Sequence, residues 1–305
     1  NVIHCRDLVS FDMGGTTAKL ALIEEGRPRI TNLFEADKVK MKEGSGLPII
    51  VPAIDLIEIG AGGGSIASVK MGVIKVGPES AGAEPGPVCY GQGGQEPTVT
   101  DTNLVLGYLD PNYFLGGRKR LDREAAYRSI EEKIAKPLGL DVIQAAWGIH
   151  DMVNRNMAAA TRIVSVERGK DPRRFPLVVF GGAGPAHGSR IAKELGISRV
   201  FVPIGAGVTS AIGLLVAGLS FDFNVSYMKI LSHEILDRIN SMFVEMQLQG
   251  EKMLKKAKAS GEYTFFRTAD MRYWGQGEHF NVPIPDGTLA ERDLEEIKKR
   301  FNRVY

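Results

Sequence analysis

The chain of 305 residues is 44% hydrophobic and 24% charged, and its formal net charge is +2 at pH 7. This balance gives no indication of nucleic-acid or membrane binding, and no apolar run reaches the length of a transmembrane segment or a signal peptide. The two cysteines, Cys5 and Cys89, are too few for a disulfide framework or a cysteine-based metal cluster, so we expect a reducing, cytoplasmic setting.

The first predicted element is a β-hairpin whose tip carries polar groups. Residues 8–11 form a short apolar run that ends in Asp12-Met13-Gly14-Gly15-Thr16-Thr17, and residues 18–23 are typical of the returning strand. Glycines let the backbone approach an anion, successive N–H groups can point at phosphate oxygens, and Asp12 is a suitable Mg²⁺ ligand. Walker A loops and dinucleotide fingerprints both open a helix, so neither fits here. A phosphate-binding loop and a plain Gly-Gly hairpin turn remain as alternatives.

The next segment predicts short strands separated by glycine-rich turns. Three β-rich runs indicate strands, at residues 54–59, 65–69 and 73–76. The turn between the first two holds four candidates for a second anion or substrate site, Gly62, Gly63, Gly64 and Ser65. The alternative is a tight turn between strands. Residues 77–97 lack periodicity, which predicts a long, ordered loop, and three of its polar residues are candidates to line a cleft, Glu79, Ser80 and Glu84.

Helices are predicted to follow this loop. Asp101 is a candidate cleft residue, with polar support or a helix cap as the alternative. A helix is expected over residues 122–134, and a longer one begins at Asp141, where apolar residues recur at intervals of three and four. At its end, Glu167 and Arg168 either approach a nucleotide or form a solvated pair.

A strand, a glycine-rich turn and a helix come next. Residues 176–180 predict a buried strand, 186–195 a helix and 199–203 a second strand, which implies a parallel pair with a right-handed crossover. The turn contains Gly181, Gly182 and Gly184, which either permit close packing or let a flat ring or ribose lie against the backbone. A hairpin followed by parallel strands predicts a mixed α/β sheet with helices on both faces. An amphipathic helix over 231–258, two strands and a charged final helix complete the chain.

The hairpin and the later strand–glycine turn–helix together resemble the actin, sugar-kinase and heat-shock-ATPase superfamily, which has a ribonuclease H-like fold. Five longer runs are similar to the hydantoinase A/5-oxoprolinase family, which includes N-methylhydantoinase A, and these runs are residues 60–67, 76–87, 97–103, 165–169 and 180–185. The resemblance extends from about Asp7 to about Pro283. It identifies the hairpin with the second phosphate motif of the superfamily.

The resemblance implies ATP and magnesium as cofactors, and hydrolytic opening of a cyclic amide after its carbonyl is phosphorylated. Asp12 is then the catalytic residue, as the Mg²⁺ contact or by orienting the attacking group. The alternative is a hairpin Asp that caps its own turn. Four residues of the hairpin tip would cradle phosphate, namely Gly14, Gly15, Thr16 and Thr17, while Lys19 reaches a phosphate or faces solvent. Gly181, Gly182 and Gly184 would contact adenosine or ribose. His187, near a helix N-terminus, is either a neutral donor to nucleotide or substrate or a satisfied structural group.

Two departures from the family pattern shape the expected organisation. The chain contains one phosphate hairpin and begins with Asn1, so we expect a central portion of a longer protein carrying half of an ATP cleft. Residues 1–228 would form the actin-like ATPase domain and residues 229–305 a helical and β segment that is cut short. Thr17-Ala18-Lys19 differs from the oxoprolinase pattern, which favours N-methylhydantoin or hydantoin over 5-oxoproline as the substrate.

Other functions compatible with the same residues remain open. One is the ATP-binding subunit of an acetone or acetophenone carboxylase, and another is a non-enzymatic actin-like ATPase switch. The family resemblance also implies a hydantoinase B-type partner subunit or domain, and it leaves a homo-oligomer open. Cys89 has no base placed beside it by the sequence, so a small packed thiol is the favoured interpretation.

Overall fold

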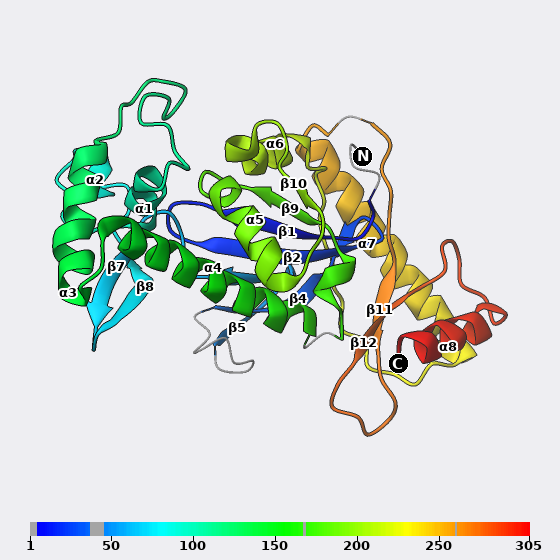
Figure 1. Cartoon of the computed structure of the whole chain (residues 1–305). Helices are drawn as coiled ribbons and strands as arrows, with labels where there is room; N and C mark the ends of the chain where they lie inside the picture. Colours follow the sequence, from blue (N-terminus) through cyan, green and yellow to red (C-terminus); the bar gives the residue numbers. More distant parts are fainter. Residues whose placement is uncertain (1–4, 37–45, 167–168, 260) are drawn as a thin grey trace. The chain divides into compact units, whose positions relative to one another are not determined.

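A computed structural model describes residues 5–36, 46–166, 169–259 and 261–305 (Figure 1). The chain divides into two units, residues 1–216 and residues 217–305, which are described separately below. The expected domain boundary at residue 228 stays a prediction. None of the helices in these ranges combines the length and the apolar character that crossing a membrane requires.

The sheet of the first unit is built on the predicted hairpin. Strands β1 (Leu8–Met13) and β2 (Ala18–Glu24) pair antiparallel, and Met13 faces Ala18, so residues 14–17 form the tip. β1 also pairs in parallel with β9 (Leu177–Phe180), and β9 pairs in parallel with β10 (Val200–Phe201). The hairpin, the β-α-β unit and the mixed sheet are thereby confirmed. The sheet order is β10-β9-β1-β2-β3, where β3 is Arg27–Pro28, and β6 (Leu56–Ile59) also pairs with β2.

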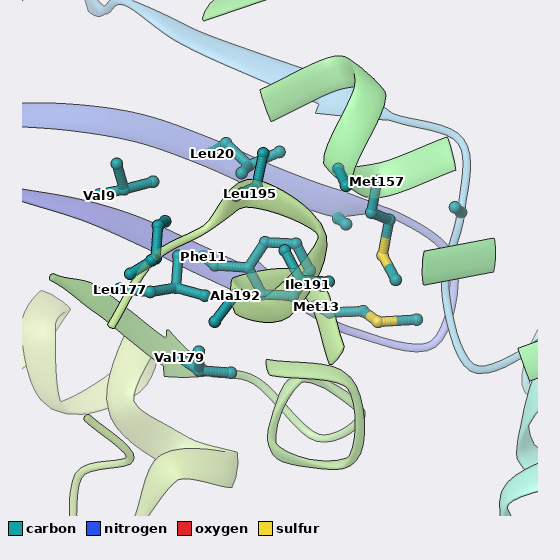
Figure 2. Close-up of a cluster of buried hydrophobic side chains, with 14 of the residues drawn as sticks. Val9, Phe11, Met13, Leu20, Met157, Leu177, Val179, Ile191, Ala192 and Leu195 are labelled. Carbon is teal, nitrogen blue, oxygen red and sulfur yellow. The ribbon is translucent and has the colours of Figure 1, made fainter. Parts of the chain in front are cut away.

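Alternation along β1 decides which face of this sheet is the core. Phe11 and Met13 are fully buried, and Figure 2 shows them among apolar side chains of α4 (Val142–Val166) and α5 (Gly184–Leu195). These two helices pack on each other and on the sheet. Side chains alternate across a strand, so Asp12 lies on the opposite face, where Ser210 of α6 (Thr209–Val216) contacts it.

A second hydrophobic cluster lies against the N-terminal half of α4. It draws on the hairpin of β7 (Ser65–Lys70) and β8 (Val73–Ser80), and on α1 (Val99–Val105) and α2 (Arg123–Ile130). A π-helical turn over Glu131–Ala135 and the short α3 (Lys136–Leu138) continue α2, so the helix expected over 122–134 changes character at its end.

Several elements differ from the sequence prediction. The expected strand over residues 54–59 is two strands, because β5 (Leu47–Ile54) pairs with β4 (Ile30–Ala36) while β6 pairs with β2. The loop expected from residue 77 begins after β8 ends at Ser80. The second unit follows the prediction, with a helix, a strand pair and a final helix, which are α7 (Leu236–Lys256), β11 (Thr268–Met271), β12 (Phe280–Pro283) and α8 (Asp293–Val304).

Candidate functional site

Three glycine turns meet at the end of strand β1. The amide of Gly63 donates a hydrogen bond to the carbonyl oxygen of Gly14 at 3.0 Å, and the amide of Gly64 donates to that of Gly15 at 2.6 Å. From the other side, the amide of Ala183 donates to the carbonyl oxygen of Met13 at 2.9 Å. The structure therefore brings together the three glycine-rich segments that the sequence singled out.

The hairpin tip presents backbone donors to the surface. The Gly14 amide closes the tip by donating to the Thr17 carbonyl oxygen at 3.0 Å, and Gly15 and Thr16 are exposed. Within the described residues, the amides of Gly15, Thr16 and Thr17 donate no hydrogen bond. Successive free N–H groups in a tight turn form a concavity suited to an anion.

The turn from Gly62 to Ser65 packs against the hairpin tip. All four residues are buried, and a Cβ on Gly62 would lie 2.6 Å from the backbone of Gly15 and Thr16. Ser65 uses its hydroxyl oxygen to accept the amide of Gly62 at 2.9 Å. These contacts are those of the tight-turn alternative, in which glycine is needed for close packing.

The turn from Gly181 to Gly184 contains two kinds of glycine. Gly181 has a φ of +88°, and a Cβ there would lie 2.7 Å from the carbonyl carbon of Met13 and press on a carboxylate oxygen of Asp12. Gly184 begins α5 and is buried against Val179 and Met13. Gly182, by contrast, is exposed and has open space where a Cβ would stand.

Asp12 lies between the hairpin tip and this third turn. Its side chain is partly exposed, and its Oδ2 accepts a hydrogen bond from the Ser210 hydroxyl at 2.6 Å. Sequence reasoning missed Ser210, because 198 residues separate the two partners and α6 carries no recognisable motif. Lys19 is opposite Asp12 in the hairpin register and shares its face, and the Lys19 Nζ lies 3.7 Å from Glu58 at an exposed position.

The structure places Asp101 away from solvent, with its carboxylate fully engaged. Asp101 closes a capping box with Thr98 at the start of α1, and it also accepts the backbone amides of Val88 and Cys89, at 3.2 and 2.7 Å. Burial and the adjacent Asp101 charge raise the pKa of the Cys89 thiol, which matches the packed thiol expected. Asp101 thus ties the 87–89 segment to α1.

The remaining candidates occupy varied positions. Ser80 lies next to Gly64 and accepts the amide of Gly82 at 3.2 Å, while Glu79 is exposed on β8. His187 is fully buried in the first turns of α5, and burial lowers the pKa of His187 to about 3, so the ring is neutral. Glu167 and Arg168 lie outside the described residues.

A cavity of about 420 Å³ adjoins the second glycine turn. Its walls come from the end of β6 with Gly60 and Ala61, from β8, and from Met152 and Asn156 of α4. The lining mixes apolar side chains with polar groups.

Comparison with known proteins adds independent findings. Residues 3–223 match the hydantoinase/oxoprolinase family. The chain is 37% identical to the caprolactamase α subunit of Pseudomonas jessenii, over 98% of this chain and 42% of the relative. It is 31% identical to a 5-oxoprolinase of Dictyostelium discoideum, over 98% of this chain and 24% of the relative.

Solved structures agree with these matches. A nucleotide-free structure of acetone carboxylase, studied for ATP-dependent acetone carboxylation, superposes with a TM-score of 0.79 at 29% identity, covering 100% of this chain and 43% of that one. The chain thus spans less than half the length of the curated relatives it matches.

Proposed function

Because the chain belongs to the hydantoinase/oxoprolinase family, we propose that its three glycine turns form part of an ATP site that drives hydrolytic opening of a cyclic amide. The observation that carries the proposal is the hairpin tip, where three amides that donate no hydrogen bond among the described residues directly follow strand β1, which carries Asp12. Caprolactamase and 5-oxoprolinase, both named for cyclic-amide substrates, support the reaction class.

The residues present fit a nucleotide and its metal. The amides of residues 15–17 would receive phosphate oxygens, with the hydroxyls of Thr16 and Thr17 beside them. The open backbone at Gly182 leaves room for ribose or a base, as the sequence implied for Gly181, Gly182 and Gly184. Among the described residues, no three His, Cys, Asp or Glu side chains cluster as a metal site, so Asp12 would hold Mg²⁺ together with phosphate oxygens rather than within a protein cage.

The chemistry of the amide explains the need for ATP. An amide carbonyl is a weak electrophile, and ATP supplies a phosphoryl group to its oxygen while ADP leaves. One water can then add to the carbonyl carbon, and the ring C–N bond breaks as the nitrogen takes up a proton, which leaves an acyl phosphate. A second water hydrolyses the acyl phosphate to the carboxylate and free phosphate. The role of the hairpin tip is to orient the transferred group and offset its charge, which are the main tasks in phosphoryl transfer. We propose the cavity lined by Gly60 and Ala61 as the space for the ring.

A ketone carboxylase subunit is the second candidate function. The superposition on acetone carboxylase, with a TM-score of 0.79, supports this function. In that case the same site would phosphorylate an enol or bicarbonate. Since relatives include α, β and γ subunits, both candidate functions imply a partner subunit, for which a hydantoinase B-type chain is our proposal. We further propose a cytoplasmic setting.

Release of ADP by the full-length protein tests both candidates. N-methylhydantoin, hydantoin, 5-oxoproline and caprolactam would be supplied in turn, and acetone with bicarbonate separately. Stimulation by a cyclic amide supports the first function, stimulation by acetone with bicarbonate supports the second, and no stimulation by any of them overturns both.

Asp12→Asn tests the role of the carboxylate within the same assay. We expect ADP release to be lost while the circular dichroism spectrum is unchanged. Glu25→Gln is the matched control, because it removes an exposed carboxylate at the far end of β2. Unchanged turnover in Asp12→Asn would remove this residue from the mechanism.

A further inference from the structure

Four polar side chains form a buried ring behind the glycine turns. Asn103 comes from α1, His150 and Asn154 from α4, and His187 from α5, and none is more than 2% exposed. Burying an amide or imidazole is unfavourable unless its polar atoms find partners. A ring of this kind therefore needs a reason beyond filling space.

Hydrogen bonds within the ring run in one direction. His150 Nδ1 donates to Asn103 Oδ1 at 3.1 Å, and Asn103 Nδ2 donates to His187 Nε2 at 3.0 Å. His187 Nδ1 donates to Asn154 Oδ1 at 3.1 Å, and Asn154 Nδ2 donates to the carbonyl oxygen of His150 at 2.7 Å, which closes the ring. Each histidine carries its proton on Nδ1.

The groups packed around the ring keep both histidines neutral. Burial lowers the pKa of His150 to about 4, with a further contribution from the Arg190 guanidinium that outweighs the Asp151 carboxylate. The His150 ring is stacked between His187, at 4.7 Å between centroids, and Tyr108, at 4.8 Å, while Trp147 stacks beside it at 5.7 Å. Stacking fixes the plane of the ring that Asn103 must meet.

Hydrogen bonds and shared helices connect the ring to all three glycine turns. On one side, Asn103 lies one helical turn after Thr100, whose amide and hydroxyl both donate to the Gly63 carbonyl oxygen at 2.7 Å. Gly63 in turn donates to Gly14 at the hairpin tip. On the other side, His187 belongs to the helix that begins at Gly184, next to the bond from Ala183 to Met13. Both connections therefore end at the hairpin, one at Gly14 and the other at Met13.

We propose that the ring of Asn103, His150, Asn154 and His187 is a positioning network that fixes the spacing between the hairpin tip and the turn at Gly181–Gly184. The inference rests on the proposed nucleotide site, since that spacing is the distance between its phosphate and adenosine sides. Apolar side chains could pack α1 against α5 in more than one arrangement. The hydrogen bonds of the ring are directional, so all of them form in one arrangement of the helices.

Asn103 is the residue to change, because its amide bonds the imidazole rings of both histidines, whereas Asn154 bonds one ring and the backbone carbonyl of His150. Asn103→Asp keeps an acceptor for His150 but removes the donor to His187, so His187 must take up a proton to bond the carboxylate. Asn103→Leu removes both bonds. Thr161→Val is the matched control, since Thr161 is buried on α4 and its hydroxyl donates to the Met157 carbonyl oxygen one turn earlier, away from the ring.

Two measurements on the full-length protein separate positioning from general stability. Hydrogen exchange at the amides of Gly63, Gly64 and Ala183 reports the turns directly, and the amide of Ile197 at the far end of α5 is the reference. We expect exchange at the three turn amides to accelerate about tenfold or more in both Asn103 variants, with Ile197 unchanged. NMR of the His187 ring should show a charged imidazole near neutral pH in Asn103→Asp only.

Affinity for ATP is the second readout. We expect the KM for ATP to rise about tenfold to a hundredfold in both Asn103 variants and to stay unchanged in Thr161→Val. If the parent protein does not use ATP, the proposed function fails, and hydrogen exchange still decides whether the ring positions the turns. Unchanged exchange at the turn amides, or equal acceleration at Ile197, would overturn the inference.

Discussion

Gly181→Ala is the substitution for which the structure makes its sharpest prediction. Gly181 has a φ of +88°, a backbone conformation that residues with a Cβ rarely adopt. The new Cβ would lie 2.7 Å from the carbonyl carbon of Met13, whereas ordinary van der Waals contact begins at 3.4 Å. The Met13 carbonyl oxygen and an Asp12 carboxylate oxygen would lie closer still, so the end of β1 or the turn must move to admit the methyl group.

The expected cost follows from two separate effects. The left-handed backbone costs an alanine about 1–2 kcal/mol relative to glycine. Forcing an extra methyl group into close packing costs about 1–3 kcal/mol more. We therefore expect the free energy of unfolding to fall by about 2–5 kcal/mol, and the Asp12 carboxylate to be displaced, because it borders the same space.

Gly182→Ala is the internal control for this prediction. Gly182 has open space around the position of its Cβ, so its stability should change by less than about 1 kcal/mol. Urea unfolding of the first unit, followed by far-ultraviolet circular dichroism, measures both variants. A Gly181→Ala protein as stable as the parent would refute the reasoning, as would equal destabilisation by the two substitutions. A rise in the KM for ATP in Gly182→Ala, without a loss of stability, would support a nucleotide against this backbone.

Three further predictions follow from the buried polar groups. Lowering the pH from about 6.5 to about 4 should reduce the free energy of unfolding by about 1.4 kcal/mol per pH unit for each of His150 and His187. The reason is that the pKa values of the folded histidines are about 4 and about 3. In this range the unfolded histidines take up protons and the folded ones do not. Urea titrations across this range check it, and flat stability contradicts it. Asp101→Asn should lower the free energy of unfolding by about 3 kcal/mol, because an amide cannot accept all the hydrogen bonds that the buried carboxylate accepts. A loss below about 1 kcal/mol in urea unfolding would contradict this role of the carboxylate. Cys5 should react with a disulfide reagent in the folded protein, whereas Cys89 should react only on unfolding, because burial raises the pKa of the Cys89 thiol. Simultaneous reaction of the two thiols would show that Cys89 is not a packed, inert thiol.

The elements that were predicted correctly are those whose signal is local. The hairpin follows from an apolar run, a Gly-Gly tip and a returning run, and the pairing of Met13 with Ala18 agrees. The long helix α4 follows from apolar residues at intervals of three and four, because one side of it faces the sheet. In both cases the residues that decide the structure are neighbours in sequence.

Helices α1 and α6 were missed because neither has an amphipathic stripe. Every residue of α1 is buried, so its polar and apolar positions show no helical period. Its one local signal was the capping box of Thr98 and Asp101, which identifies the start of a helix but not its length. α6 is the converse case, with an apolar sequence that is mostly exposed in the first unit.

The buried ring shows where sequence reasoning stops for a site. His150 and Asn154 are four residues apart on one helix, and that spacing is visible in the sequence. Asn103 and His187 are 84 residues apart, and nothing near either residue indicates the other. A histidine next to a glycine turn therefore suggested either ligand contact or structural support, and only the fold shows that both of its ring nitrogens are engaged within the protein.

The glycines make the same point in physical terms, because a glycine is required wherever a side chain would meet backbone and also wherever a ligand would meet backbone. Gly62 and Gly181 belong to the first kind, since a Cβ at either would collide with the hairpin. Gly15 and Gly182 belong to the second, since both are exposed with open space around them. Both kinds of glycine occur in the same type of glycine-rich turn, so the sequence does not separate them. The distinction assigns the open glycines to ligand affinity, so alanine at Gly15 or Gly182 should raise the KM for ATP and spare the stability, whereas alanine at Gly62 or Gly181 should lower the stability.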